Sequence, residues 1–193
     1  AGLHPNLVSM LAEVNGVDAH NKSQKGLVMQ LIPNDYFNLG LPPTLESCTR
    51  DHFDDALNLP LKHLVKIMLQ VTSALLHLHE KQLCHGDLYA HNILINHAAS
   101  VLLSDFGAAS HFSHLPSHQQ TALQVIEKRA LGHLLEDLLK VCSDDDTDLI
   151  HANMLGNLRT TQLQLVNSNL QNNQKLSLVE FKSQLSDVVT SLS

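Results

Sequence analysis

The stretch LCHGDLYAHNILINHAASVLLSDFGAAS, residues 83–110, decides the fold expected of this chain. It holds two short apolar runs, ILI at 93–95 and VLL at 101–103, which the polar segment NHAAS separates. Short aliphatic runs on either side of a polar segment predict the two strands of a β-hairpin. Polar and charged residues crowd the outer ends of both runs, where a purely structural hairpin would not require them.

The predicted hairpin would gather oxygen-bearing side chains at one edge. Asn92 precedes the first run, and Ser104 and Asp105 follow the second, so antiparallel pairing places them side by side. Asp87 lies in the loop just upstream and can face the same space. Carboxylate and amide oxygens suit Mg²⁺, which takes one or two carboxylates and completes its coordination with phosphate and water. A remaining carboxylate is free to orient a hydroxyl nucleophile.

Composition narrows the classes of protein that the sequence can belong to. With 193 residues, 44% of them hydrophobic, the chain can build one sizeable core. Its net charge of −7 argues against unaided binding to nucleic acid or to an anionic membrane surface. No apolar run is long enough to insert into a bilayer. Its three cysteines share no close spacing, which favours a reduced, cytoplasmic setting over a disulfide framework.

Apolar periodicity predicts the remaining elements. These are a hairpin formed by strands at 6–14 and 26–32, a core helix over 59–82, a second helix from Ser117 to Cys142 and a last helix from Leu178. Ser117 with Gln120, and Ser177 with Glu180, have the spacing of capping boxes. The polar stretch 143–175 is expected to hold one or two short helices, with a solvated acidic turn at 144–148.

Two motifs in the opening stretch resemble those of a known family. HGDLYAHN (85–92) resembles the catalytic loop of eukaryotic-like protein kinases, H-R-D-L-x-x-x-N. SDFG (104–107) resembles their magnesium-binding D-F-G. Both motifs occur in the kinase order, around two predicted strands and behind a predicted helix. More narrowly, the sequence is similar to kinase domains that follow leucine-rich repeats in some bacterial proteins.

The resemblance implies a mainly α fold, the helical large lobe of a kinase, over residues 39–193, with a small β-hairpin at the catalytic loop. Residues 1–38 would supply the last strands of the small lobe and the hinge. The glycine loop, the catalytic lysine and helix αC are expected upstream of Ala1 in a longer polypeptide. That upstream segment is a partner the chain would need, because this fragment alone is expected to bind ATP weakly and to be inactive.

The resemblance also assigns roles to residues of the predicted edge. Asp87 would orient the hydroxyl of the substrate, and His85 would brace the catalytic loop. Asn92 and Asp105 would bind Mg²⁺, with Asp105 bridging the phosphates of ATP. Phe106 matches a position of the regulatory spine.

Three residues of the predicted hinge would contact the nucleotide. Met29 matches the gatekeeper position, and the backbone of Gln30 and Ile32 would meet the adenine edge. In the second helix, Glu127 stands where kinases place an acid that anchors the catalytic loop. The alternative for Glu127 is an ordinary exposed glutamate.

Departures from the kinase pattern leave the substrate open. Gly86 replaces the arginine that pairs with a phosphorylated activation loop, and Tyr89 replaces a lysine of serine/threonine kinases. An H-G-D loop also occurs in small-molecule phosphotransferases. We expect an ATP- and Mg²⁺-dependent serine/threonine-protein kinase with a protein substrate. The alternatives are a pseudokinase or scaffold lobe and a small-molecule phosphotransferase.

The many histidines raise the possibility of a zinc site. His77, His79, Cys84 and His85 are close in the sequence. However, His77 and His79 lie on different faces of one predicted helix, and zinc ligands usually occur as spaced pairs on a turn. The sequence therefore predicts no zinc site here.

Overall fold

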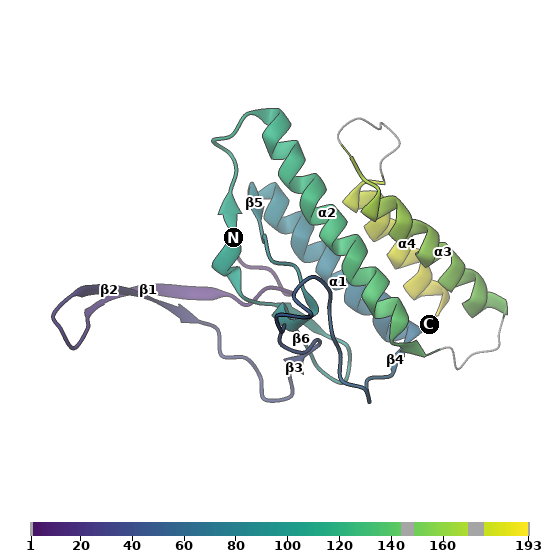
Figure 1. Ribbon diagram of the computed structural model, residues 1–193, viewed down its shortest axis with the longest axis horizontal. Helices are drawn as coiled ribbons and strands as arrows, with labels where there is room; N and C mark the ends of the chain where they lie inside the picture. The colour runs from purple at the N-terminus through teal and green to yellow at the C-terminus, as the bar shows by residue number, and fades with distance from the viewer. Residues whose placement is uncertain (1, 144–148, 170–175, 193) are drawn as a thin grey trace.

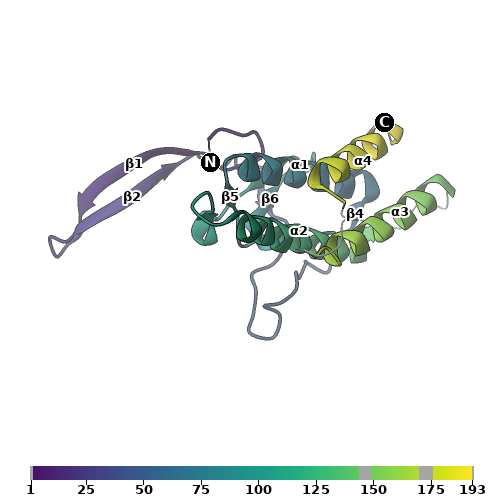
Figure 2. The same ribbon diagram turned by 90° about the horizontal axis from the view of Figure 1, so that it is seen from above.

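The computed structural model describes residues 2–143, 149–169 and 176–192 (Figure 1). Within these ranges the helices are α1 (Leu61–Glu80), α2 (Ser117–Lys140), α3 (Leu149–Val166) and α4 (Leu178–Ser191). Helix α1 packs against α4 and α2 packs against α3, which the view from above shows (Figure 2). Several short strands accompany the helices, so the fold is mixed α/β and not mainly α as expected.

Helix α1 is the core helix that the apolar spacing predicts. Leu64, Met68, Val71 and Leu75 follow one another at intervals of three or four residues, and each is 0% exposed. Burial of each such side chain contributes about 1.5–3 kcal/mol. Helix α1 therefore provides the buried apolar surface against which β4 (Leu59–Pro60), β5 (Leu83–Cys84), β7 (Val101–Leu103) and β9 (Cys142–Ser143) pack.

The predicted hairpin at 93–103 is confirmed. Strands β6 (Ile93–Ile95) and β7 (Val101–Leu103) are antiparallel, with Ile93 opposite Leu103, and β3 (Phe37–Asn38) pairs with the other edge of β6. All residues of β6 and β7 are buried. The hairpin is thus short and covered, and its outer ends are fixed by the core beneath them.

Asn96 holds the turn of this hairpin. Its Oδ1 accepts hydrogen bonds from the backbone N–H of Ala98 (3.1 Å) and Ser100 (3.0 Å). Ala99 adopts a positive φ of 54°, and its N–H donates to the Asn96 carbonyl. Asn side chains commonly close turns in this way.

The first hairpin forms, but at a different place in the chain and in a different environment. Strands β1 (Met10–Val17) and β2 (Ser23–Met29) project from the body and are exposed along nearly their whole length (Figure 1). The expected first strand, 6–14, therefore begins later and runs further than predicted. Residues 6–8 instead lie along β7, where Val8 N–H donates to the Leu103 carbonyl and Leu103 N–H donates to the Asn6 carbonyl.

Two further strand pairs tie loops to the helices. β4 (Leu59–Pro60) runs parallel to β9 (Cys142–Ser143), joining the start of α1 to the end of α2. β5 (Leu83–Cys84) is antiparallel to β8 (Ser110–His111). The second pair brackets the segment 85–109, so both ends of the predicted site are held together.

The two predicted capping boxes have different outcomes. Ser177 accepts from Glu180 N–H at 3.1 Å and Glu180 accepts from Ser177 N–H at 2.7 Å, which confirms the box at α4. The box at α2 is wrong: Pro116 is the N-cap, and Gln120 donates to the Leu115 carbonyl at 2.7 Å. Pro116 cannot offer the side-chain acceptor that a capping box needs.

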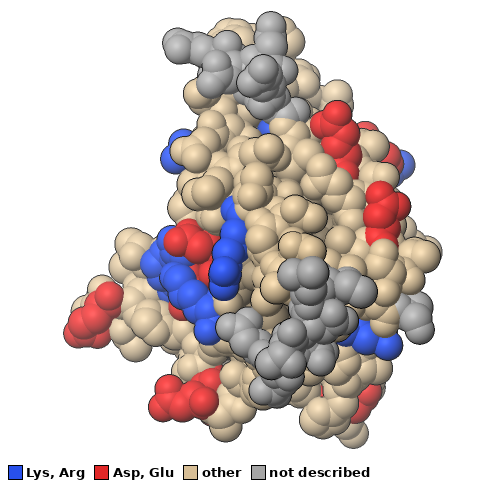
Figure 3. All heavy atoms as spheres, turned by 90° about the vertical axis from the view of Figure 1, so that its right-hand side faces the viewer, with Lys and Arg blue, Asp and Glu red and all other residues tan. Residues whose placement is uncertain are grey.

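The polar stretch after α2 holds one long helix, α3, where one or two short helices were expected. The predicted acidic turn at 144–148 lies outside the described residues. The face that carries α3 and α4 is largely uncharged in its described part, with a few acidic and basic side chains scattered over it (Figure 3). Within the described ranges, no helix combines the length and the apolar character needed to cross a membrane.

Candidate active site

The loop at 85–92 is anchored from below by Glu127 of α2. The carboxylate of Glu127 is buried, and its Oε1 accepts hydrogen bonds from the backbone N–H of His85 (2.6 Å) and Gly86 (3.0 Å). Its Oε2 lies 2.6 Å from Nε2 of His79. Glu127 is therefore not an ordinary exposed glutamate, because both of its oxygens are engaged with the loop and with α1.

His85 links this loop to the end of β7. Its side chain is fully buried, and its Nε2 lies 2.8 Å from the carbonyl oxygen of Ser104. The backbone N–H of Asp87 donates to Nδ1 at 3.4 Å, so the ring proton belongs on Nε2, which donates to Ser104. The ring also packs 5.1 Å from the ring of Phe106. These contacts hold the two motifs against each other.

The structure brings Asp87 and Asn92 into direct contact. Nδ2 of Asn92 donates to the backbone carbonyl of Asp87 (2.9 Å) and to its carboxylate oxygen Oδ2 (3.0 Å). The backbone carbonyl of Asn92 accepts from both N–H and Oγ of Ser104, each at 2.9 Å. Asn92 therefore connects the loop carboxylate to the far strand, as antiparallel pairing predicts.

Asp105 follows Ser104 at the same edge but points into its own turn. It adopts a left-handed backbone (φ 53°), which aspartate tolerates better than most residues, and its Oδ1 accepts from Gly107 N–H at 3.0 Å. No hydrogen bond joins its side chain to Asp87 or Asn92 among the described residues. The site thus brings its residues to one edge through the backbone, while the carboxylate of Asp105 stays exposed.

The edge carries uncompensated negative charge. Neither Asp87 nor Asp105 forms an ion pair with any residue in the described part of the chain. Oδ1 of Asn92 has no hydrogen bond there either, since Nδ2 makes both of its side-chain bonds. Two carboxylates and a free amide oxygen form the set of hard ligands that a divalent cation such as Mg²⁺ prefers.

The backbone at position 86 explains why a glycine stands where the kinase motif has arginine. Its φ is +82°, and a Cβ placed there would lie 2.5 Å from the carbonyl oxygen of Ala108. Glycine adopts positive φ without strain and permits this close approach of two backbones. The catalytic-loop candidate and the turn after Asp105 therefore touch directly, with no side chain between them.

The geometry agrees with a comparison against known protein families. The model for the family described as protein tyrosine and serine/threonine kinase matches residues 3–144, which is most of the chain. The chain belongs to the protein kinase family. The match includes the catalytic-loop and D-F-G motifs and the whole of α1 and α2.

Individual relatives are also kinases. The chain is 35% identical over 111 residues to the glycogen synthase kinase-3 homolog YGK3 of Saccharomyces cerevisiae, covering 55% of this chain and 27% of that protein. It is 29% identical over 113 residues to protein kinase MCK1 of the same yeast, covering 58% of this chain and 28% of MCK1. Serine/threonine-protein kinase PrkC of Bacillus subtilis is 42% identical over 52 residues, which are 27% of this chain and 8% of PrkC.

The chain thus spans about a quarter or less of the length of these kinases. Its similarity to serine/threonine kinases is modest in identity. The comparisons give no support to the narrower resemblance to kinases with leucine-rich repeats.

The hinge residues expected to contact the nucleotide lie where β2 returns to the body of the kinase. Met29 ends β2 and is 40% exposed, and Gln30 N–H donates to the Ser9 carbonyl at 2.8 Å. Among the described residues, neither the Gln30 carbonyl nor the Ile32 N–H has a backbone partner. The side chain of Ile32 packs on a small apolar cluster with Leu94 and Leu102 of the kinase hairpin.

The loop at 85–92 has a second support on its other side, which the sequence did not predict. The carboxylate of Asp51 accepts from the Ala90 N–H at 2.6 Å, and burial raises the pKa of this carboxyl. Asp137 in α2 accepts from Asp51 N–H at 3.2 Å and from Arg50 Nε at 3.0 Å. No periodicity or motif marks Asp51, because it lies in the stretch that the sequence presents only as a loop.

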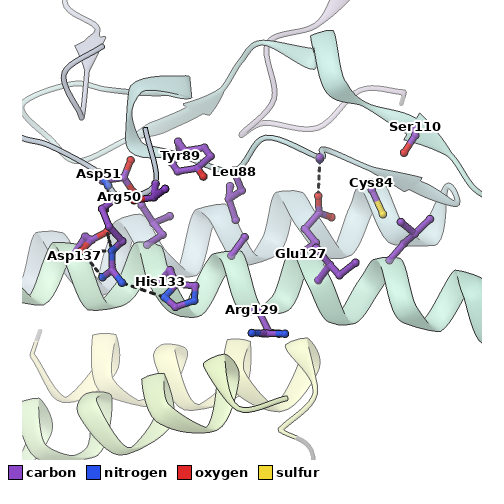
Figure 4. A pocket seen from close by; sticks show the side chains of 16 residues that line it. Arg50, Asp51, Cys84, Leu88, Tyr89, Ser110, Glu127, Arg129, His133 and Asp137 are labelled. Carbon is purple, nitrogen blue, oxygen red and sulfur yellow. Dashed lines mark hydrogen bonds and ion pairs between the residues drawn. The ribbon is translucent and has the colours of Figure 1, made fainter. Parts of the chain in front are cut away.

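A pocket of about 460 Å³ separates this loop support from the anchor at Glu127 (Figure 4). Its walls are residues 49–51, the catalytic-loop residues Gly86, Leu88 and Tyr89, and one side of α2. In Figure 4 the bonded pair Arg50 and Asp137 lies at one end, and Glu127 and Cys84 at the other. The loop at 85–92 is thus held at two points, with the pocket between them.

Proposed function

We propose that this chain forms the catalytic segment of an ATP- and Mg²⁺-dependent protein kinase that phosphorylates serine or threonine hydroxyls. Membership of the kinase family and similarity to serine/threonine kinases support this proposal. The observation that carries it furthest is the contact of Asn92 with Asp87, because it joins the two residues the mechanism needs most. Residues 39–193 would serve as the large lobe and residues 1–38 as the last small-lobe strands and hinge.

Asp87 is proposed to orient the attacking hydroxyl. Its carboxylate receives one hydrogen bond from Nδ2 of Asn92, and its backbone N–H is tied to His85. These bonds fix the position of the carboxylate while leaving its other oxygen available to accept a hydroxyl proton. Phosphoryl transfer depends mainly on positioning and electrostatics, so a carboxylate held in this way can contribute strongly.

Asn92 and Asp105 are proposed to hold Mg²⁺. Oδ1 of Asn92 and Oδ2 of Asp105 accept no hydrogen bond at this edge within the described residues, so both are available to a cation. When bound, Mg²⁺ would neutralise negative charge on the phosphates of ATP. His85 would contribute by position only, since its two nitrogens are occupied by Asp87 N–H and the Ser104 carbonyl.

The adenine of ATP is proposed to meet the hinge beside Met29. The Gln30 carbonyl and the Ile32 N–H are the backbone acceptor and donor without a backbone partner there, within the described residues. Met29 would form part of the wall behind the base. This arrangement would put the nucleotide between the hinge and the cation-binding edge.

The substitution Asp87→Asn in the protein that carries this chain tests the proposal. Amide replaces carboxylate at nearly constant volume, so turnover of a labelled-ATP assay should fall by about 10²–10⁴-fold while ATP affinity is unchanged. Asp187→Asn, at an exposed position of α4, is the matched control and should keep full turnover. A normal rate for Asp87→Asn would reject the assigned role.

A small-molecule acceptor is the second candidate. The observation in its favour is Gly86, whose close approach to Ala108 leaves no room for the arginine that reads a phosphorylated activation loop. Label transferred from ATP to a generic protein substrate would support the protein kinase. Label appearing only in small molecules would support the alternative, and no transfer at all would favour a scaffold role.

A further inference from the structure

A second cluster of ligand-type side chains lies beneath the catalytic loop. It comprises His79 from α1, Cys84 from β5 and Glu127 from α2, and its ligand atoms all lie within 4.8 Å of one another. Within the described residues, it is the one group of three such side chains that is this compact. His79 and Cys84 are five residues apart, whereas Glu127 lies more than 40 positions further along the chain, so the packing of α2 completes the cluster.

The surroundings hold this cluster in place. Cys84 and Glu127 are each 4% exposed. Pairing of β5 with β8, which sets Cys84 opposite Ser110, fixes the backbone at the cysteine. The buried ring of Phe112 packs edge-on to His79, with ring centroids 6.4 Å apart. A site built in this way is preorganised, because none of its ligands lies on a loose loop.

We propose that Nε2 of His79, Sγ of Cys84 and Oε2 of Glu127 bind a divalent transition metal, with Zn²⁺ as the ion that they suit best. Imidazole, thiolate and carboxylate are the three ligand types that zinc takes in proteins. A thiolate makes Mg²⁺ or Ca²⁺ an unsuitable occupant, since both prefer oxygen ligands. This site is separate from the proposed Mg²⁺ ligands Asn92 and Asp105.

The nitrogen and oxygen ligands require only a small adjustment. Zn–N and Zn–O bonds of about 2.0–2.2 Å in a tetrahedral site set the two ligand atoms about 3.4 Å apart. Nε2 of His79 and Oε2 of Glu127 now lie 2.6 Å apart, sharing a proton. They would separate by less than about 1 Å as the metal replaces that proton. Oε1 of Glu127 would keep its bonds to the N–H groups of His85 and Gly86.

The charges of the site balance when the metal is present. Burial, together with the charge of Glu127, raises the pKa of the Cys84 thiol to about 12, so without a metal the thiol stays protonated. A Zn²⁺ ion would neutralise one thiolate and one carboxylate, leaving no net charge in the buried site. On binding, Cys84 releases its thiol proton to solvent, and the ring proton of His79 moves from Nε2 to Nδ1, so that a neutral imidazole binds the metal.

The cluster has an entry path and room for a fourth ligand. Cys84 and Glu127 both line the pocket of about 460 Å³ and lie side by side at one end of it (Figure 4). Three protein ligands with an open fourth position is the pattern of zinc sites that carry a water or an exchangeable ligand. The bound ion would cross-link α1, β5 and α2 directly under the catalytic loop.

Co²⁺ titration of the metal-free chain tests this site, because a thiolate ligand gives Co²⁺ a charge-transfer absorption that histidines alone do not give. The wild-type chain should bind one equivalent with this absorption, and Zn²⁺ should abolish it. Cys84→Ser should lose the absorption and weaken Zn²⁺ binding by about 100-fold or more. His79→Gln, which keeps an N–H donor for Glu127, should weaken binding similarly.

Matched controls are Cys142→Ser, a half-buried cysteine outside the cluster, and His63→Gln on the same helix as His79. Both should bind as the wild type does. Equal Zn²⁺ binding by Cys84→Ser and wild type would show that other histidines hold the metal and would overturn the proposal. So would a wild-type complex without the thiolate absorption.

Alkylation of the wild-type chain tests the same site without any substitution, so the result does not depend on whether a variant folds. Zn²⁺ should slow alkylation of Cys84 at least about 10-fold, measured by mass spectrometry, while the exposed Cys48 reacts at the same rate with and without the metal. If Zn²⁺ leaves the alkylation rate of Cys84 unchanged, the site is wrong.

Discussion

The hairpin β1–β2 and the hairpin β6–β7 are both antiparallel, but they differ in length and in burial. Strands β6 and β7 are three residues long and fully buried, whereas β1 and β2 are eight and seven residues long and exposed. An isolated two-stranded hairpin is at best marginally stable in water. The short hairpin owes its rigidity to α1, β3 and residues 6–8, which pack around it.

This difference explains where the candidate chemistry resides. Asn92 and Asp105 flank the covered hairpin, so packing in the core sets their positions. The exposed hairpin contributes only its base, where Met29 and Gln30 enter the proposed hinge. Residues that must be placed to within a fraction of an ångström belong on the rigid element.

Truncation of one leucine in each hairpin should give the largest difference in stability between the two hairpins. Leu103→Ala in β7 deletes a side chain that is 0% exposed and should lower the free energy of unfolding by about 2–5 kcal/mol. Leu27→Ala in β2, where the side chain is 60% exposed, should change it by less than about 0.5 kcal/mol. Urea unfolding of both variants measures this. Equal losses would mean that the long hairpin is as well covered in solution as the short one.

A glycine in each part of the molecule gives a second test of the difference between the packed region and the exposed hairpin. Gly86→Ala imposes positive φ on alanine and sets its Cβ against the Ala108 carbonyl, which should cost about 1–3 kcal/mol. Gly16→Ala in β1 has nothing within 4 Å of the added carbon and should cause no loss. Thermal melting midpoints compare the two. An unchanged midpoint for Gly86→Ala would show that the loop shifts freely away from residues 106–108.

The smallest expected effect concerns the two turns, each closed by one side chain. Asn96→Ala removes the two hydrogen bonds that close the turn of the buried hairpin and a third, exposed one to Asp35, and should lower global stability by about 1 kcal/mol. Asp18→Ala removes the equivalent bonds to His20 and Lys22 in the exposed hairpin. Hydrogen exchange should then rise in β1 and β2 alone, with global stability preserved. A global loss for Asp18→Ala would contradict the independence of the two hairpins.

Local signals in the sequence were sufficient for the elements that local chemistry controls. The runs at 93–95 and 101–103, separated by a turn, predict the buried hairpin, and Ser177 with Glu180 predicts the start of α4. Periodic apolar residues predict α1 for the same reason. In each case the deciding contacts join residues only a few positions apart.

Contacts between distant residues were not predictable in the same way. Glu127 meets His79 and Cys84 across more than 40 positions of sequence, whereas zinc ligands are recognisable in a sequence mainly when they are close neighbours in the chain. Asp51 contacts Ala90 in the same non-local manner. Apolar residues in β1 and β2 predict strands correctly but say nothing about whether another element covers them.

The seam between residues 6–8 and β7 has a mechanical consequence. Backbone hydrogen bonds fasten Leu103 to Asn6 and Val8, and Ser9 is fastened in turn to Gln30 at the foot of the long hairpin. A force applied at the tip of that hairpin would be transmitted along β1 and β2 to Leu103, which lies two residues before Asp105. The protruding hairpin therefore acts as a lever, and a protein that binds its tip would move the edge that carries Asp105.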